Sequence, residues 1–150
     1  MEAAVASLIG VGLGGGFSLL GQWAVQRQAV RAETERRRQD RTEARRAERL
    51  ELAREFIATA QLAERAAEER DRLEGDAAWQ QRSLDVVDRL WVHERMVHVL
   101  FGRAAHDGAR RYVEALSQVL FGDLGGVTWQ DRLRGPKVTF LEAARAELGS

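Results

Sequence analysis

The residues that come closest to a chemical motif are His93-Glu94-Arg95-Met96-Val97-His98, a histidine pair that flanks a glutamate. A helix that holds zinc places its two histidines four residues apart, so that both rings face the metal. Here the spacing is five residues, which turns the two rings about 140° apart on a helix. His106 adds no third ligand at a useful spacing, and the chain has no cysteine. We therefore expect no metal site, and we expect His93 and His98 to be packed or solvent-exposed.

Other arrangements that could carry chemistry are incomplete. The stretch from Gly10 to Gly15 matches G-x-G-x-x-G, with Glu33 or Glu35 near the distance of a ribose-binding acid. A dinucleotide fold then requires further buried strands, whereas an Arg/Glu-rich helical pattern follows. The glycine-rich stretch 122–126 lacks the Lys-Ser/Thr pair of a phosphate loop, and no serine has the context of an activated nucleophile. The sequence predicts no catalytic residues and no cofactor.

The N-terminal segment carries the sequence signal for the location of the protein in the cell. Residues 3–26 contain no charged side chain. As a helix this stretch is about 35 Å long, which exceeds the roughly 30 Å hydrocarbon core of a bilayer. Trp23 then lies at the membrane interface, and Arg27 and Arg31 follow it. The sequence predicts a transmembrane helix over 3–26. A cleaved signal peptide fits less well, because the start is acidic and the apolar run is too long.

Small residues form a stripe along this helix. Four of them recur at every fourth position, and a further glycine continues the same face: Ala6, Gly10, Gly14, Ser18 and Gly21. Small residues at this spacing let two helix backbones approach closely in lipid. We expect the helix to self-associate into a homo-oligomer, although a glycine-rich helix without a partner is the alternative.

Charge sets the expected orientation. No basic residue precedes the apolar segment, whereas nine arginines lie within residues 27–49. The positive-inside rule then places the N-terminus outside and the larger C-terminal part in the cytoplasm, anchored in the cell's inner membrane.

Residues 27–74 form the expected second element, a charged helix without proline or glycine. Its first part carries five acidic residues among the nine arginines, and pairs such as Glu33 and Arg37 lie four residues apart. The interleaved acids argue against a nucleic-acid-binding arm. Apolar residues return at Leu50 on a broad face, which is suited to packing in a bundle.

Residues 76–150 are predicted to form a cytoplasmic helical domain. Asp76 can cap a helix that ends near Phe101, a second helix covers 103–121, and Thr128 to Asp131 forms a capping box that opens a short turn. Pro136 would then start the last helix. A strand remains an alternative for residues 90–101. Three groups of apolar residues are expected to be buried: Leu84, Val87, Leu90, Trp91, Val97, Leu100 and Phe101; Ala105, Ala109, Tyr112, Val113, Leu116 and Leu120; Val138, Leu141, Ala144 and Leu148.

The fold class expected from these elements is all-α: an N-terminal transmembrane helix, a long charged helix and a small helical bundle. This plan, which ends in the helix FLEAARAELG, resembles uncharacterised bacterial single-pass membrane proteins. It also looks like the membrane-anchored stator b subunit of rotary ATP synthases. The chain departs from that subunit in its glycine ladder, its short charged helix and its compact second half, so that function is not carried over.

The function expected from the sequence is that of a non-enzymatic membrane anchor and scaffold, with the lipid bilayer, other copies of itself and an unidentified cytoplasmic protein as partners. Two alternatives remain open. One is a small oligomeric pore or membrane-disrupting protein, in which the glycine stripe lines or closes a channel. The other is a soluble or peripheral helical subunit of a larger assembly.

Overall fold

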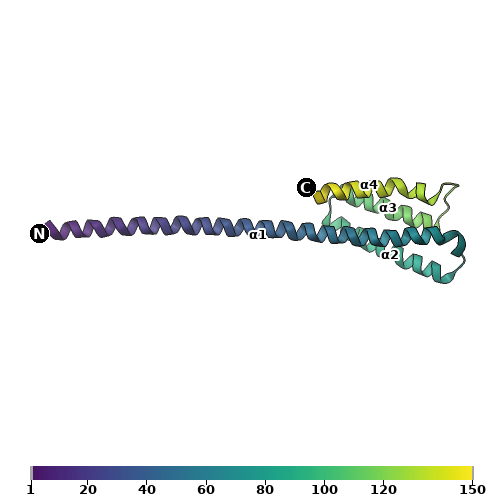
Figure 1. Ribbon diagram of the computed structural model, residues 1–150, viewed down its shortest axis with the longest axis horizontal. Helices are drawn as coiled ribbons and strands as arrows, with labels where there is room; N and C mark the ends of the chain where they lie inside the picture. The colour runs from purple at the N-terminus through teal and green to yellow at the C-terminus, as the bar shows by residue number, and fades with distance from the viewer. Residues whose placement is uncertain (1, 150) are drawn as a thin grey trace. The chain divides into compact units, whose positions relative to one another are not determined.

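The computed structural model describes the backbone of residues 2–149 and the side chains of Glu33 and residues 35–149. This part contains four helices and no strand: α1 (Glu2–Leu73), α2 (Ala77–Leu100), α3 (Arg103–Phe121) and α4 (Trp129–Gly149) (Figure 1). The predicted all-α class is confirmed, and residues 90–100 belong to α2 instead of a strand. Among the described residues, no helix has an apolar stretch sufficient to cross a bilayer. The side chains of the predicted membrane helix, 3–26, lie outside the described part.

The chain divides into two units, 1–44 and 45–150. The described side chains of the first unit are exposed, as the charge pattern predicts for a solvated helix. The Arg37 Nε atom lies 2.9 Å from Glu33 Oε1, which confirms the ion pair expected from their spacing. Such an exposed pair stabilises a helix by a few tenths of a kcal/mol, about 0.3–0.5.

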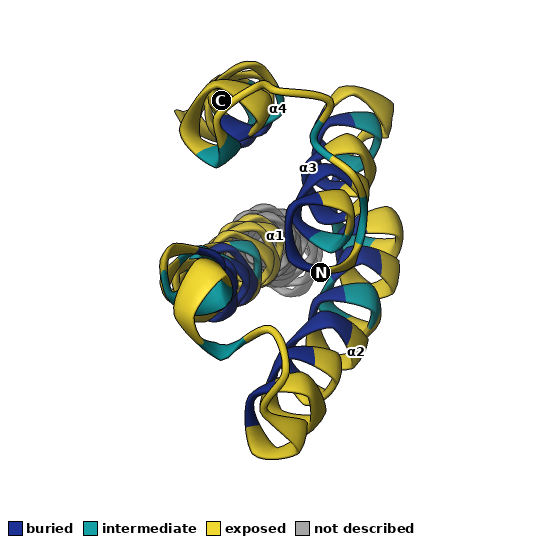
Figure 2. Ribbon diagram, turned by 90° about the vertical axis from the view of Figure 1, so that its right-hand side faces the viewer, coloured by how far each residue is buried: buried dark blue, intermediate teal, exposed yellow. Residues whose placement is uncertain are grey.

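The second unit is a bundle in which α3 lies between α2 and α4, and the buried side of α1 faces α3 (Figure 2). The apolar face predicted for 103–121 is confirmed, since all six of its residues are buried: Ala105, Ala109, Tyr112, Val113, Leu116 and Leu120. Residues 52–67 of α1 enter the same core. The bundle therefore includes part of the stretch 27–74, whereas the sequence predicts a domain over 76–150.

Three aromatic rings from three helices meet at the centre of the bundle. The Phe56 ring of α1 lies 4.6 Å from that of Phe140 in α4 and 6.2 Å from that of Tyr112 in α3, between centroids. Burial of one such ring stabilises a fold by about 1.5–3 kcal/mol. Close to this cluster, a Cβ atom added to Gly108 would lie 2.9 Å from the Phe140 Cα atom. A glycine is therefore required where α3 crosses α4.

Polar side chains fix two of the helix starts. The Asp76 carboxylate accepts hydrogen bonds from the N–H groups of Ala78 and Trp79, at 2.7 and 3.2 Å. The Thr128 hydroxyl accepts one from the Asp131 N–H at 3.2 Å and donates to the Asp131 carboxylate at 2.8 Å. These contacts confirm both predicted caps, which satisfy N–H groups that have no partner within the helix.

The prediction that the last helix begins at Pro136 is wrong. α4 begins at Trp129 and continues through Pro136. A proline ring normally clashes with the Cβ atom of the preceding residue in helical conformation. Here the preceding residue is Gly135, which has no Cβ, so the helix can continue.

Two arginines of α1 bind the C-terminal ends of other helices. Arg49 Nε donates to the carbonyl oxygen of Leu100 at 2.6 Å, and its guanidinium lies 5.8 Å from the Phe101 ring centroid. Arg70 Nη1 donates to the carbonyl oxygen of Val119 at 2.6 Å. These carbonyls have no partner within their own helix, and the negative end of the helix dipole favours a cation there.

Three residues predicted to be buried are exposed. Leu84 of α2 is 47% exposed, and Val138 and Leu141 of α4 are 46% and 37% exposed. The buried side of α2 lies opposite Leu84, because Trp79, Ser83 and Leu90 face the core. Val138 and Leu141 lie on the side of α4 that is turned towards α1, where they line hollows between the two helices.

Candidate functional site

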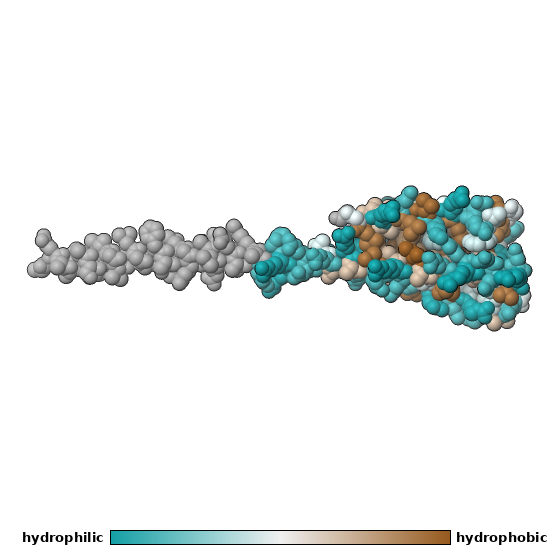
Figure 3. Space-filling model, viewed as in Figure 1, coloured by the Kyte–Doolittle hydropathy of each residue, from teal (hydrophilic) through white to brown (hydrophobic). Residues whose placement is uncertain are grey.

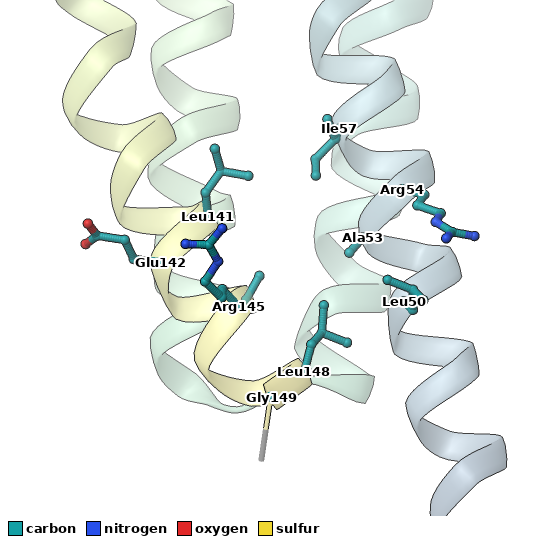
Figure 4. A pocket seen from close by; sticks show the side chains of 10 residues that line it. Leu50, Ala53, Arg54, Ile57, Leu141, Glu142, Arg145, Leu148 and Gly149 are labelled. Atoms are coloured by element: carbon teal, nitrogen blue, oxygen red, sulfur yellow. The ribbon is translucent and has the colours of Figure 1, made fainter.

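A cavity of about 600 Å³ opens between α1 and α4 (Figure 4). In the close-up, Leu141 and Leu148 extend from α4 towards α1, and Ile57 lies on the facing side of α1. The lining is mostly apolar: Leu50, Ala53, Ile57, Leu141, Ala144 and Leu148. We call this space, with its continuation towards the start of α4, the α1–α4 groove.

The edge of the groove carries charges of both signs. Glu142 and Arg54 extend away from it in Figure 4, and Arg54 pairs with Glu51 at 3.8 Å. Arg145 lies on α4 between Leu141 and Leu148 and has no ion-pair or hydrogen-bond partner in the part of the chain that the structure describes. Glu142 likewise has no such partner among the described residues, so the rim of the groove carries unpaired charges of both signs beside an apolar floor.

At its other end the groove is crossed by a polar link. Lys137 Nζ of α4 lies 2.8 and 3.0 Å from the two carboxylate oxygens of Glu64 in α1. The Tyr112 hydroxyl of α3 donates to the same carboxylate. Glu64 thus joins three helices, and a smaller hollow of about 290 Å³ continues beyond it, beside Trp129 and Leu133.

The polar link affects the acidity of Tyr112. Burial raises the pKa of its hydroxyl well above the usual range, and the hydrogen bond and negative charge of Glu64 raise it further. All three effects disfavour the tyrosinate. Tyr112 therefore remains a hydrogen-bond donor to Glu64 over the physiological pH range and acts as a fixed structural element.

The surface view shows apolar patches beside the α1–α4 groove, with hydrophilic side chains between some of them (Figure 3). In Figure 3, brown side chains gather along the line between α1 and α4, with hydrophilic side chains on both sides. An extended apolar groove with a polar rim is the geometry that binds an amphipathic helix, whose apolar face enters the groove. At the rim, Arg145 would pair with a carboxylate and Glu142 with a basic side chain.

A second polar cluster lies at the corner between α2 and α3. His98 Nδ1 and His106 Nδ1 are 3.2 Å apart, and His106 Nε2 lies 2.7 Å from Glu94 Oε1. If His106 donates to the buried Glu94 carboxylate, its Nδ1 must accept from His98 when both rings are neutral. His93 lies elsewhere, 3.8 Å from Glu55.

This cluster brings together two histidines that sequence spacing had separated. His98 is nearest in the sequence to His93 on the same helix, whereas its neighbour in space is His106 on the next helix. Among the described side chains, no three His, Asp or Glu residues are arranged to hold a metal ion. His106 Nε2 is the hydrogen-bond partner of the buried Glu94 carboxylate.

The residues predicted for self-association and for the membrane interface lie outside the described side chains. These are Ala6, Gly10, Gly14, Ser18 and Gly21, and Trp23, Arg27 and Arg31. The sequence predicts no residue for partner binding, and the link between Glu64, Tyr112 and Lys137 is not visible in it. One signal was available, since Tyr112 is the only tyrosine and Lys137 the only lysine of the chain.

Comparison of the chain with protein-family models, with curated proteins and with solved structures gives no match in any of the three.

Proposed function

We propose that this protein is a non-enzymatic, single-pass membrane anchor and scaffold. Its N-terminal helix self-associates through the small-residue stripe, and its helical bundle, 45–150, lies in the cytoplasm and binds a protein partner. The partner presents an amphipathic helix that carries charged side chains beside its apolar face.

The observation that carries the proposal is the α1–α4 groove. Leu50 and Leu141, which line the larger cavity, and Val138, which lines the smaller hollow, are each more than a third exposed. Apolar surface gathered in a groove with a polar rim is typical of protein-binding sites. Arg145 and Glu142, both unpaired at its rim, offer ion-pair partners to charged side chains beside the apolar face of such a helix.

Membrane anchoring is tested by flotation of the full-length protein on vesicles before and after a wash with alkaline carbonate. We expect the protein to stay with the lipid, because a spanning helix is not released by loss of surface charge. Release by carbonate would contradict the anchor and would favour a peripheral assembly subunit.

Self-association is tested by the mass of the full-length protein in detergent. Replacing Gly10 and Gly14 with leucine should lower the oligomer number, because bulky side chains keep the backbones apart. Gly12 and Gly16 lie on the opposite side of the helix, so replacing them with leucine gives a matched control. An unchanged mass for the first variant would contradict this part of the proposal.

Orientation is tested in intact cells with cysteines introduced into the cysteine-free chain. A membrane-impermeant thiol reagent should label Ala3→Cys from outside and should reach Gln118→Cys only after the cells are opened. The reverse pattern would place the bundle outside.

A further inference from the structure

The corner between α2 and α3 brings two histidine rings together. His98 lies in the last turn of α2 and His106 in the first turn of α3, and their Nδ1 atoms are 3.2 Å apart. Two nitrogen ligands of a tetrahedral zinc ion, each about 2.0–2.1 Å from the metal, lie about 3.3 Å from each other. The two ring nitrogens therefore have nearly the separation that a shared metal ion requires.

The second ring nitrogen of His106 is held by a carboxylate. Its Nε2 atom lies 2.7 Å from Glu94 Oε1, and Glu94 is 7% exposed. A neutral ring that donates from Nε2 keeps a lone pair on Nδ1, which is the atom that faces His98. Metal-binding histidines commonly donate their other N–H to a carboxylate in this way, which orients the ring and makes the ligating nitrogen more basic.

A hollow of about 380 Å³ opens beside the pair, and both rings line it. Because no three His, Asp or Glu side chains of the described residues are arranged to hold a metal ion, water has to complete the coordination of an ion bound here. The hollow has space for several water molecules, at about 30 Å³ each. His98 is exposed, so its ring can turn to direct its Nδ1 lone pair at the ion.

The charges that surround the pair favour a cation. Asp107 also lines the hollow, and its Oδ1 atom lies 3.8 Å from His106 Nδ1. Asp107 and Glu94 together bring two negative charges to the rings. Arg103 Nε lies 3.6 Å from Asp107 Oδ2, but the Arg103 side chain is 93% exposed, so water screens its charge. The Asp107 carboxylate can accept a hydrogen bond from a metal-bound water.

From this geometry we propose that His98 and His106 form a binding site for Zn²⁺ or a related divalent cation that prefers imidazole. Nδ1 of each ring is a ligand, water completes the coordination, and Glu94 orients His106. The ion joins the last turn of α2 to the first turn of α3. No residue of this site lines the α1–α4 groove, so the site is separate from the proposed partner-binding surface.

The fold supplies a pair of histidines that the sequence does not show. The absence of a metal site is expected from the sequence because His93 and His98 are wrongly spaced on one helix. His106 becomes the partner of His98 only when α3 folds back beside α2. His93 lies elsewhere on α2, 3.8 Å from Glu55, and is not part of the proposed site.

The site is tested by calorimetric titration of the full-length protein in detergent with Zn²⁺. We expect one Zn²⁺ per chain, and His98→Ala should weaken binding about tenfold or more, because one of two protein ligands is lost. His93→Ala is the matched control and should keep the affinity. Mg²⁺ is the control for binding by surface carboxylates, since it prefers oxygen ligands and should not bind the histidine pair.

A second variant tests the role of the carboxylate. His106→Ala would leave the buried Glu94 without its partner, so the exposed His98 is the better position at which to remove a ligand. Glu94→Gln keeps an oxygen that can accept from His106 Nε2 but removes the negative charge. It should weaken Zn²⁺ binding about tenfold, as expected for a group that orients a metal ligand.

Binding should also stabilise the bundle, because the ion joins two helices that separate when the chain unfolds. At a free Zn²⁺ concentration about a hundredfold above Kd, the melting temperature of the full-length protein should rise by about 5 °C or more. The rise should be present in His93→Ala and absent from His98→Ala at the same Zn²⁺ concentration.

Two outcomes overturn the proposal. One is an affinity for Zn²⁺ that His98→Ala leaves unchanged, or that His93→Ala lowers equally. The other is binding of Zn²⁺ no stronger than that of Mg²⁺, which would leave the contact between His98 and His106 as a hydrogen bond between neutral rings. Neither outcome affects the flotation and detergent results that test the proposed anchor.

Discussion

Arg49 Nε lies 2.6 Å from the carbonyl oxygen of Leu100, and this contact joins α1 to the last residue of α2 across 51 positions of sequence. Arg70 makes the equivalent contact with Val119 near the end of α3. In both cases an arginine of α1 donates a hydrogen bond to a carbonyl in the last turn of another helix, which has no partner within that helix.

Replacing Arg49 or Arg70 with methionine should therefore destabilise the bundle. The apolar stem is kept, so the loss reports the hydrogen bond to the carbonyl, about 1.5–3 kcal/mol for a charged donor. Denaturant unfolding followed by tryptophan fluorescence measures it. Arg72→Met serves as the control because Arg72 is exposed, and its free energy of unfolding should stay within about 0.5 kcal/mol of the unmodified protein.

Gly108→Ala should destabilise the contact between α3 and α4. The added methyl group would lie 2.9 Å from the Phe140 Cα atom, so the two backbones must separate. Overpacking of this kind costs about 1–3 kcal/mol, although alanine itself favours a helix by up to about 1 kcal/mol. Thermal unfolding checks the prediction. At Gly75 the added methyl group meets no atom within 4 Å, so Gly75→Ala should leave the melting temperature nearly unchanged.

Tyr112 should make the stability of the protein depend on pH in alkaline solution. Its pKa in the folded protein is raised above the usual value of 10.0, so the unfolded chain loses the proton first. The stabilisation is complete below pH 10.0 and falls as the pH rises beyond it, by up to about 1.4 kcal/mol per pH unit. Unfolding of the full-length protein at a series of alkaline pH values measures this slope.

Tyr112→Phe should reduce that slope, because the phenylalanine ring has no proton to lose. A direct check is available, since Tyr112 is the only tyrosine and the absorbance of tyrosinate reports it alone. In the folded protein this absorbance should rise only as the chain unfolds. Ionisation near the normal pKa without unfolding would contradict the buried hydrogen bond to Glu64.

His106→Ala should cost more stability than His98→Ala. His106 is the partner of Glu94, which is 7% exposed, and its removal leaves the carboxylate buried and unpaired. That loss amounts to about 1–3 kcal/mol or more. His98 contacts Nδ1 of His106, whereas Glu94 is bound at Nε2. Removal of His98 therefore leaves the contact between His106 and Glu94 in place. Equal free energies of unfolding for the two variants would show that Glu94 does not depend on His106.

Local signals account for what could be predicted from the sequence. The face of α3 repeats through its whole length, so periodicity identifies its buried residues. Asp76 and Thr128 act on N–H groups within three residues of themselves, and such caps are visible in sequence. The predicted helix start at Pro136 is wrong because the effect of a proline depends on the residue before it, which here is Gly135.

Contacts between residues that are distant in the sequence cannot be predicted from local patterns. Glu64 meets Tyr112 and Lys137 across 48 and 73 positions, and no local pattern relates them. On α2, apolar residues occur on two opposite faces. Periodicity finds both faces without showing which one is buried, and this is why Leu84 was assigned to the core.

The position of Phe56 has a consequence for synthesis of the chain on the ribosome. Its ring is fully buried against Tyr112 and Phe140, which are added 56 and 84 residues later. At about 5–20 residues per second, roughly 4–17 s pass between the synthesis of Phe56 and the synthesis of Phe140. Once these residues have left the ribosome, the nascent chain presents Leu52, Phe56 and the neighbouring alanines to solvent until Phe140 follows, and a chaperone can bind that surface.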